Sequence, residues 1–147
     1  MAKDLTSALG LGPREHVALV GGGGKTSLMQ ALAKELKRGG ARVVTTTTTK
    51  LSQKEAQRFP CVILCSSDSS WHQRLREGLE SYGSLFVAQR LLDSGKVEGV
   101  SPQLADSLFK DPLVDHLILE ADGSAGRPLK APAAHEPVIP SSVSLVV

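Results

Sequence analysis

Short apolar, β-branched runs alternate with longer amphipathic stretches along this chain of 147 residues. The apolar runs predict strands at residues 16–20, 42–47, 61–65, 84–89 and 114–121. The amphipathic stretches predict helices at residues 25–38, 70–81 and 101–109, and a short helix or turn at residues 51–59. This alternation is typical of a mainly parallel sheet flanked by helices, so we expect an α/β fold.

The last part of the sequence lacks this periodicity. From Asp122 to Pro140, nineteen residues contain four prolines, and a loop of this length in a compact domain is usually functional or disordered. The chain then ends within SVSLVV, residues 142–147, which is again strand-like. Because a buried parallel strand is normally followed by a segment that covers it, we expect the domain formed by residues 1–147 to be incomplete at its C-terminal end.

Composition and charge exclude several classes of protein. The net charge is +2, and lysines and arginines are spread among acids, so no basic tract indicates a nucleic-acid partner. No apolar run approaches the roughly eighteen residues that span a bilayer, and the N-terminus lacks the apolar segment of a signal peptide. Cys61 and Cys65 would lie about 13 Å apart on one strand face, at roughly 3.3 Å per residue, too far for a disulfide. We therefore expect a cytoplasmic protein with reduced thiols and no membrane partner.

The stretch VALVGGGGKTS joins a predicted strand to a predicted helix, which is the context of a phosphate-binding loop. Four consecutive glycines can turn their N–H groups around an anion, Lys25 can reach the β and γ phosphates, and the Thr26 hydroxyl can reach Mg²⁺. The usual pattern has its first glycine where Leu19 stands, so we expect Gly21 to turn the chain in a tighter loop. The alternative is a glycine-rich turn without a ligand, although four glycines would then cost folding entropy. The predicted nucleotide site comprises Gly21, Gly22, Gly23, Gly24, Lys25, Thr26 and Ser27.

The stretch LILEAD ends with two acids, Glu120 and Asp122. An apolar strand that ends in an acid is the general form of a Walker B element, whose carboxylate holds Mg²⁺ directly or through water. We assign Asp122 to the metal, together with Thr26, and Glu120 to polarising the attacking group, although the sequence also fits the reverse assignment or a pair of solvated acids. For these roles the strand at residues 115–121 has to lie beside the strand at residues 16–20.

Further candidates follow from the run VVTTTTTK and from the proline-containing loop. The last threonines, Thr48 and Thr49, lie beyond the predicted strand, where they can contact a phosphate or complete a Mg²⁺ shell, and Lys50 can meet an anionic substrate. Threonine also favours strands for purely structural reasons. Arg127 and Lys130 lie on a glycine-containing segment that can close over the γ-phosphate, or they are solvated surface charges.

The segments GGGGKTS, VVTTTTTK, KVEGVSP and EADGSAGRPLKAPAAHEPVIP together resemble the YqeC-type family of selenium-dependent hydroxylase accessory proteins. This resemblance implies a P-loop NTPase-like fold and a role in the maturation of selenium-dependent molybdenum hydroxylases. It implies such a hydroxylase, or its cofactor, as a partner. Family members are usually longer than this chain.

These observations favour Mg²⁺-dependent binding of a nucleotide, with hydrolysis or phosphoryl transfer as an accessory step in that maturation. ATP is favoured over GTP because the chain contains no asparagine and therefore no N-K-x-D guanine motif. The alternatives are a nucleotide-gated binding protein or metallochaperone, and an ATP-dependent ligase, since Mur-type ligases also combine a G-K-T loop with threonines. The sequence indicates neither the acceptor nor the oligomeric state.

Overall fold

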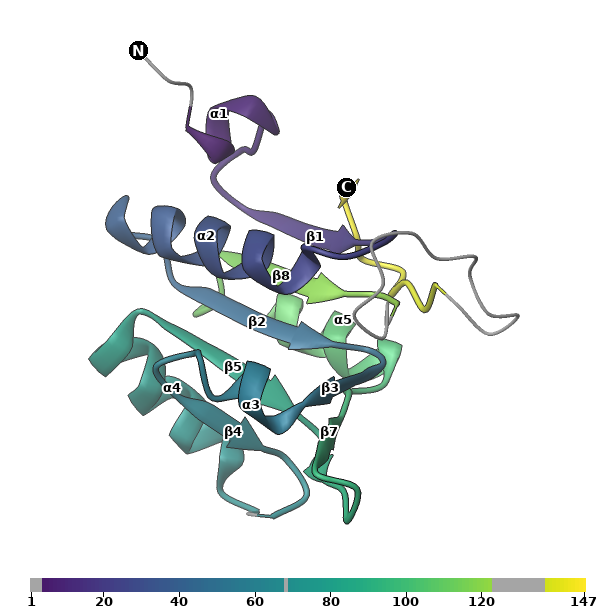
Figure 1. Ribbon diagram of the computed structural model, residues 1–147. Coiled ribbons are helices and arrows are strands. Elements are labelled where there is room, and N and C mark those ends of the chain that lie inside the picture. Colours follow the sequence, from purple (N-terminus) through teal and green to yellow (C-terminus); the bar gives the residue numbers. More distant parts are fainter. Residues whose placement is uncertain (1–3, 68, 123–136) are drawn as a thin grey trace.

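A parallel sheet of six strands organises the chain (Figure 1). The computed structural model describes residues 4–67, 69–122 and 137–147. In spatial order the strands are β4 (Val62–Leu64), β5 (Ser84–Ala88), β2 (Val43–Thr47), β8 (His116–Glu120), β1 (Glu15–Leu19) and β9 (Leu145–Val146). All their pairings are parallel, which confirms the predicted α/β class with a mainly parallel sheet.

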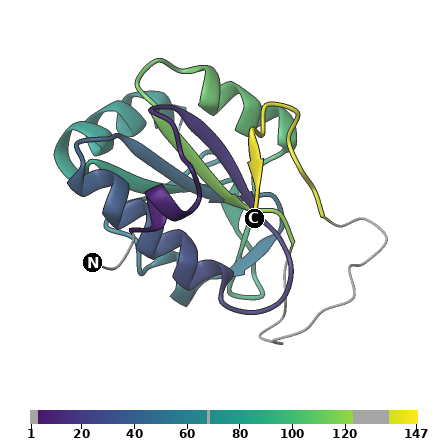
Figure 2. The ribbon, with the colours of Figure 1, turned by 90° about the horizontal axis from the view of Figure 1, so that it is seen from above.

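Helices cover both faces of this sheet (Figure 2). They are α1 (Leu5–Ala8), α2 (Lys25–Arg38), α3 (Gln53–Ala56), α4 (Trp71–Tyr82) and α5 (Pro102–Lys110). One hydrophobic core lies between the sheet and α2, with α1 and α3 beside it, and the other lies between the sheet and the pair α4 and α5. The predicted helices at residues 25–38, 70–81 and 101–109 are therefore confirmed to within one residue at each end.

Helix α2 follows from its apolar spacing and its flanking glycines. Met29, Leu32 and Leu36 are buried against the sheet, as apolar residues three and four apart on one helix face should be. Gly24 precedes the helix in the left-handed region, and Gly39 follows its last residue. The helix therefore starts directly after the glycine loop, with its N-terminus at the carboxyl end of β1.

The alternation of side chains in β8 decides where its terminal acid points. Leu117 and Leu119 enter the core beneath α4 and α5, whereas Ile118 enters the core beneath α2. Because successive strand residues face opposite sides, Glu120 lies on the α2 side of the sheet. Strand β8 pairs with β1 along its whole length, so the predicted adjacency of these two strands is confirmed.

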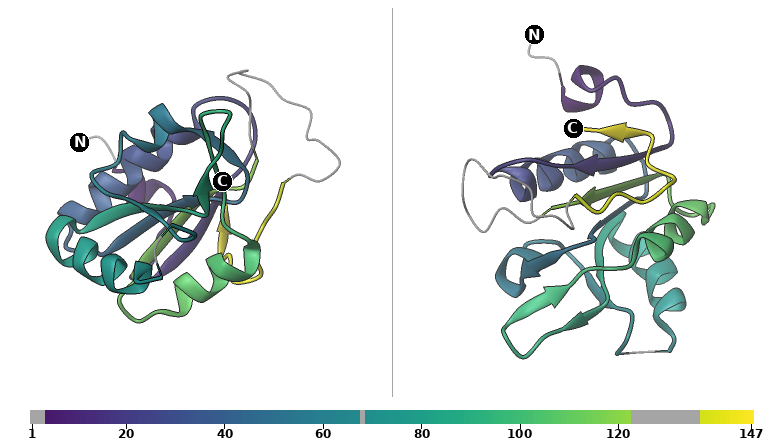
Figure 3. Two further views of the ribbon diagram at one scale, coloured as in Figure 1. Left: turned by 90° about the horizontal axis from the view of Figure 1, so that it is seen from below. Right: turned by 90° about the vertical axis from the view of Figure 1, so that its right-hand side faces the viewer.

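A second, antiparallel sheet was not predicted from the sequence. It consists of β3 (Lys50–Ser52), β7 (Lys96–Glu98) and β6 (Arg90–Leu91), in that order. It lies at the carboxyl-end side of the parallel sheet, close to the end of β2 (Figure 3). The prediction of one mainly parallel sheet was therefore incomplete, because β6 and β7 lie in residues for which no element was predicted and β3 overlaps the predicted short helix or turn at residues 51–59.

The strand-like run at residues 142–147 contributes β9, which pairs with β1 at the edge of the sheet. It is shorter and less buried than a central parallel strand, since Val146 is half exposed. Asp106 accepts hydrogen bonds from both Ser141 and Ser142, and the Ser142 hydroxyl lies 2.7 Å from Nδ1 of the buried His16. These contacts fix the segment against α5 and β1.

The cysteines and the helix lengths bear on two smaller expectations. Cys61 and Cys65 flank β4 as free cysteines, and burial raises the pKa of the Cys65 thiol to about 11. Within residues 4–67, 69–122 and 137–147, no helix has the length and apolar character needed to cross a bilayer.

Candidate functional site

The glycine loop turns at Gly21, two residues after the position of the first glycine in the usual phosphate-binding pattern. Leu19, at the place of the absent first glycine, is the last residue of β1, pairs with Glu120 and is buried. Gly21 then turns the chain with a φ of 101°, and Gly24 ends the loop with a φ of 92°. A glycine at position 19 is therefore unnecessary, because the strand continues there and Gly21 makes the turn, as expected.

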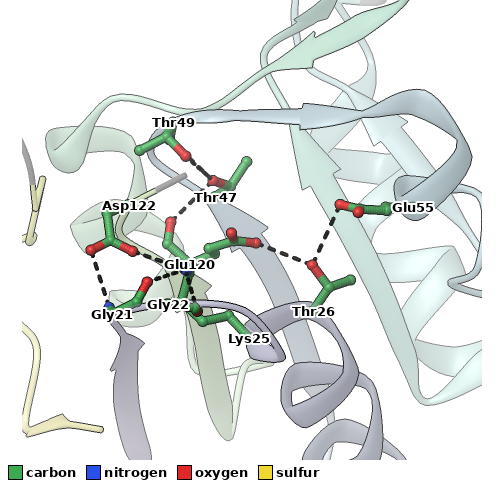
Figure 4. Close-up of polar contacts among 9 residues, drawn as sticks. All are labelled: Gly21, Gly22, Lys25, Thr26, Thr47, Thr49, Glu55, Glu120 and Asp122. Carbon is green, nitrogen blue, oxygen red and sulfur yellow. Dashed lines mark hydrogen bonds and ion pairs between the residues drawn. The ribbon is translucent and has the colours of Figure 1, made fainter. Parts of the chain in front are cut away.

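Lys25 is folded back onto this loop (Figure 4). Its ammonium group donates hydrogen bonds to the carbonyl oxygens of Gly21 and Gly22, the latter at 2.9 Å. It also lies 3.1 Å from Oδ1 of Asp122, whose Oδ2 accepts from the Gly21 N–H at 3.1 Å. Both charged side chains are buried. Lys25 and Asp122 thus form an ion pair that is hydrogen-bonded to the backbone of the glycine loop.

Thr26, the next residue of α2, faces two other carboxylates (Figure 4). Its hydroxyl donates to Oε2 of Glu120 at 3.3 Å and lies 3.5 Å from Oε2 of Glu55. Burial raises the pKa of Glu120 to about 7; the positive charge of Lys25 opposes this shift, and the negative charges of Glu55 and Asp122 add to it. The three carboxylates and Lys25 therefore form one electrostatic unit around the start of α2.

The contacts of Glu120 and Asp122 differ from those that the first assignment requires. Glu120, and not Asp122, is hydrogen-bonded to the Thr26 hydroxyl, while Asp122 contacts Lys25. Among the described residues there is no cluster of three or more histidine, cysteine, aspartate or glutamate side chains that could hold a metal ion by itself.

Glu55 is a site residue that could not be recognised from the sequence. It is the fourth residue of Ser52-Gln53-Lys54-Glu55, where the Ser52 hydroxyl accepts from the Glu55 N–H at 3.1 Å. This pattern is a capping box, in which the glutamate normally bonds back to the first residue. Here the Glu55 carboxylate reaches Thr26 instead, so a residue with an apparent capping role lies at the site.

The first three threonines of the run have structural roles. Thr45, Thr46 and Thr47 are buried in β2, and their hydroxyls donate to backbone carbonyls of the neighbouring strands β5 and β8 at 2.6–3.0 Å. These bonds satisfy the buried hydroxyl groups and join three central strands. The structural interpretation therefore applies to the first three threonines of the run.

Thr48 and Thr49 follow β2 and hold a different position. The Thr48 hydroxyl donates to the Val138 carbonyl at 2.6 Å, and the Thr49 hydroxyl lies 3.1 Å from that of Thr47. Gly99 packs against this turn, because a Cβ there would lie 2.4 Å from the carbonyl oxygens of Thr47 and Thr49. The close approach of Gly99 explains the glycine in the motif KVEGVSP.

A cleft of about 1130 Å³ brings these elements together between the start of α2, the threonine turn and the small sheet. The predicted site residues that line it are Gly23, Gly24, Lys25, Thr26, Ser27, Thr48, Thr49, Lys50 and Glu120. Gly21, Gly22 and Asp122 do not line the cleft and instead contact Lys25 within the loop. Arg127 and Lys130 lie outside the described residues.

Comparison with known proteins identifies relatives of this chain. The sequence profile of the family described as "YqeC protein" matches residues 17–147. "Uncharacterized protein YqeC" of Escherichia coli (strain K12) is 38% identical over 131 residues, which are 89% of this chain and 49% of that protein. The chain thus spans about half the length of this relative. No solved structure matches the chain.

Proposed function

The chain belongs to the YqeC family, as its four sequence motifs indicated, and we propose that it binds a nucleoside triphosphate with Mg²⁺ in the cleft. The observation that carries this proposal is the Thr26–Glu120 hydrogen bond beside Lys25, at the junction of a glycine loop and a helix N-terminus. A hydroxyl, a carboxylate and an ammonium group converge there on a cleft large enough for a nucleotide.

The phosphate chain binds at the N-terminus of α2. Free N–H groups and the helix dipole favour an anion at this position. Lys25 contributes its charge after it leaves the carbonyl groups of Gly21 and Gly22 and the carboxylate of Asp122. In this proposal Asp122 holds the lysine in place until a phosphate replaces it.

Thr26 and Glu120 are the residues that would hold the Mg²⁺ ion. Both offer hard oxygen donors, which Mg²⁺ prefers, and their oxygens lie 3.3 Å apart. Mg²⁺ is usually held by one or two protein groups plus phosphates and water, which agrees with the lack of a larger ligand cluster in the described part of the chain. When bound, Mg²⁺ neutralises charge on the phosphates. This proposal moves the metal from Asp122, to which it was first assigned, to Glu120.

The reaction we propose is hydrolysis or phosphoryl transfer, with ATP as the favoured nucleotide. In the cell it would serve as an accessory step in the maturation of selenium-dependent molybdenum hydroxylases, the role that the family resemblance implies. A hydroxylase or its cofactor is then the partner.

A nucleotide-gated binding protein or metallochaperone is the second candidate, and the Lys25–Asp122 ion pair favours it. A nucleotide that attracts Lys25 releases Asp122, which lies two residues after the end of β8. Nucleotide binding would thereby change the contacts of Asp122 with Lys25 and Gly21, and hydrolysis would restore them.

Steady-state assays with Mg·ATP separate these functions. Multiple turnovers by the isolated protein support the enzyme, whereas tight binding with turnover only in the presence of a molybdenum hydroxylase supports the gated protein. Thr26→Ala and Glu120→Gln are expected to abolish the Mg²⁺ dependence of binding. Binding that is equally Mg²⁺-dependent in both variants would overturn the metal site.

A further inference from the structure

The second wall of the cleft, away from the glycine loop, is formed by the small antiparallel sheet and by the end of α3. Strand register determines which side chains it presents, since Lys50 pairs with Glu98 and Ser52 pairs with Lys96. Directly paired residues share a face of an antiparallel sheet, so these four side chains lie on one face. Leu51, on the other face, is buried in the core. The polar face consequently lines the cleft.

The charges on this wall are unbalanced. The Glu98 carboxylate accepts from Nε of Arg90 at 2.6 Å, so it is already paired. Lys50, Lys96 and Arg58 are exposed, line the cleft and make no side-chain hydrogen bond or ion pair with any residue that the structure describes. Three unpaired cations therefore face the same space.

The opposite wall has the reverse arrangement. Glu55 and Glu120 line the cleft at the start of α2, and Asp122 lies behind them within the glycine loop; Lys25 and Thr26 are the partners of these carboxylates. The cations of the second wall thus lack acidic partners even though three carboxylates lie elsewhere at the site. The N-terminus of α5 also reaches this wall at Ser101, and its dipole adds positive potential.

The volume of the cleft leaves room for a second ligand. Sites for one small molecule measure about 300–1,000 Å³, and this cleft measures about 1130 Å³. A nucleotide with its phosphates at the start of α2 would leave space toward the small sheet. The three cations of the second wall form too small a basic surface for a nucleic acid, which requires an extended one.

We propose that Lys50, Lys96 and Arg58 bind a small anionic co-substrate, a molecule that carries a carboxylate or phosphate group, beside the nucleotide. The position of this ligand next to a nucleotide rests on the proposed function, whereas anion binding by the wall does not. The wall would attract the anion and hold it within the cleft that also contains Lys25 and Thr26.

Titration of inorganic phosphate, and separately of succinate, into protein saturated with Mg²⁺ and a non-hydrolysable ATP analogue tests this site. Amide chemical shifts in NMR spectra report the binding. Lys50→Gln and Lys96→Gln should each weaken anion binding by about threefold, and the double variant by about tenfold, as expected for exposed ion pairs. Lys54→Gln, on the same helix as Glu55 but outside the cleft, is the matched control and should bind as the wild type does.

The nucleotide affinity of the same variants shows whether the second wall binds a separate anion or the nucleotide itself. The proposal predicts an affinity within twofold of wild type, on the order of experimental error in such titrations. A parallel loss of nucleotide affinity would assign the wall to the nucleotide itself and overturn the proposal, as would the failure of wild-type protein to bind either anion. If the wild type bound no nucleotide, the proposed function would fail, and the titration without nucleotide would still test the anion site.

Discussion

The ammonium group of Lys25 lies 3.1 Å from the carboxylate of Asp122, and both side chains are almost fully buried. The pair joins the first residue of α2 to a residue two positions after the end of β8. A buried ion pair stabilises a protein only when both charges stay paired, because removal of one partner leaves an uncompensated charge. A phosphate that binds Lys25 has to replace Asp122 in this role.

Asp122→Asn is therefore expected to strengthen nucleotide binding and to lower the stability of the nucleotide-free protein. The variant removes the competitor for Lys25 and a negative charge close to the phosphates, so affinity for Mg·ATP should rise by about threefold to tenfold, or about 0.7–1.4 kcal/mol. Without nucleotide, the free energy of unfolding should fall by about 3 kcal/mol because Lys25 stays buried and unpaired. Calorimetry and urea denaturation measure the two effects.

Asp115→Asn is the control for this variant. Asp115 contacts Arg42 at the other end of β8, so its loss should leave nucleotide affinity unchanged. Weaker binding by Asp122→Asn, with loss of the Mg²⁺ dependence, would return the metal to Asp122 as first assigned.

Glu120→Gln should stabilise the empty protein in alkaline solution. Burial raises the pKa of Glu120 to about 7 from 4.5, so between these values the folded protein keeps a proton that the unfolded chain releases. The stability that this proton contributes is fully present below pH 4.5 and is lost as the pH rises through 7. At pH 8 the uncharged glutamine should raise the free energy of unfolding by on the order of 3 kcal/mol, and by much less at pH 5.

Urea denaturation with a chelator present, at pH 5 and pH 8, measures this difference. Glu80→Gln, on the exposed surface of α4, serves as the control and should show no such pH dependence. A Glu120→Gln variant that is less stable than wild type at both pH values would show that the buried carboxylate is adequately stabilised by its neighbours.

Gly99→Ala should damage the threonine turn. The new Cβ would lie 2.4 Å from two backbone carbonyl oxygens and 2.7 Å from the Thr49 amide nitrogen, and none of these atoms is at the end of a flexible side chain. We expect a loss of about 1–3 kcal/mol in the free energy of unfolding, as for other overpacked sites. Gly39→Ala is the control, because its nearest contact would be 3.4 Å and its φ of −77° suits alanine. Equal stability of the two variants would contradict the close approach at Gly99.

The sequence was most informative in its long periodic helix and in its Walker B-like acids. The four-residue spacing of apolar residues in residues 25–38 predicted α2, because burial of one helix face imposes this pattern directly. The acids that end the apolar run at residues 115–121 predicted that β8 lies beside β1.

The small sheet escaped prediction because its strands are too short to show a period. Strands β3, β6 and β7 contain two or three residues each, and β3 pairs with β7 across more than forty residues of chain. Glu55 was missed for a related reason, since its local pattern indicates a helix cap and only the tertiary fold brings it to Thr26. Contacts of this kind depend on chain topology, which local propensity does not encode.

Calorimetric titration of Mg·ATP into the wild type, Lys25→Ala and Lys34→Ala tests nucleotide binding at the glycine loop most directly. Lys34 lies on the exposed face of the same helix, so its variant controls for the loss of a positive charge on α2. We predict that Lys25→Ala binds at least about tenfold more weakly than wild type, or about 1.4 kcal/mol, and that Lys34→Ala binds as wild type does. Equal affinity of the wild type and Lys25→Ala would contradict the proposed site.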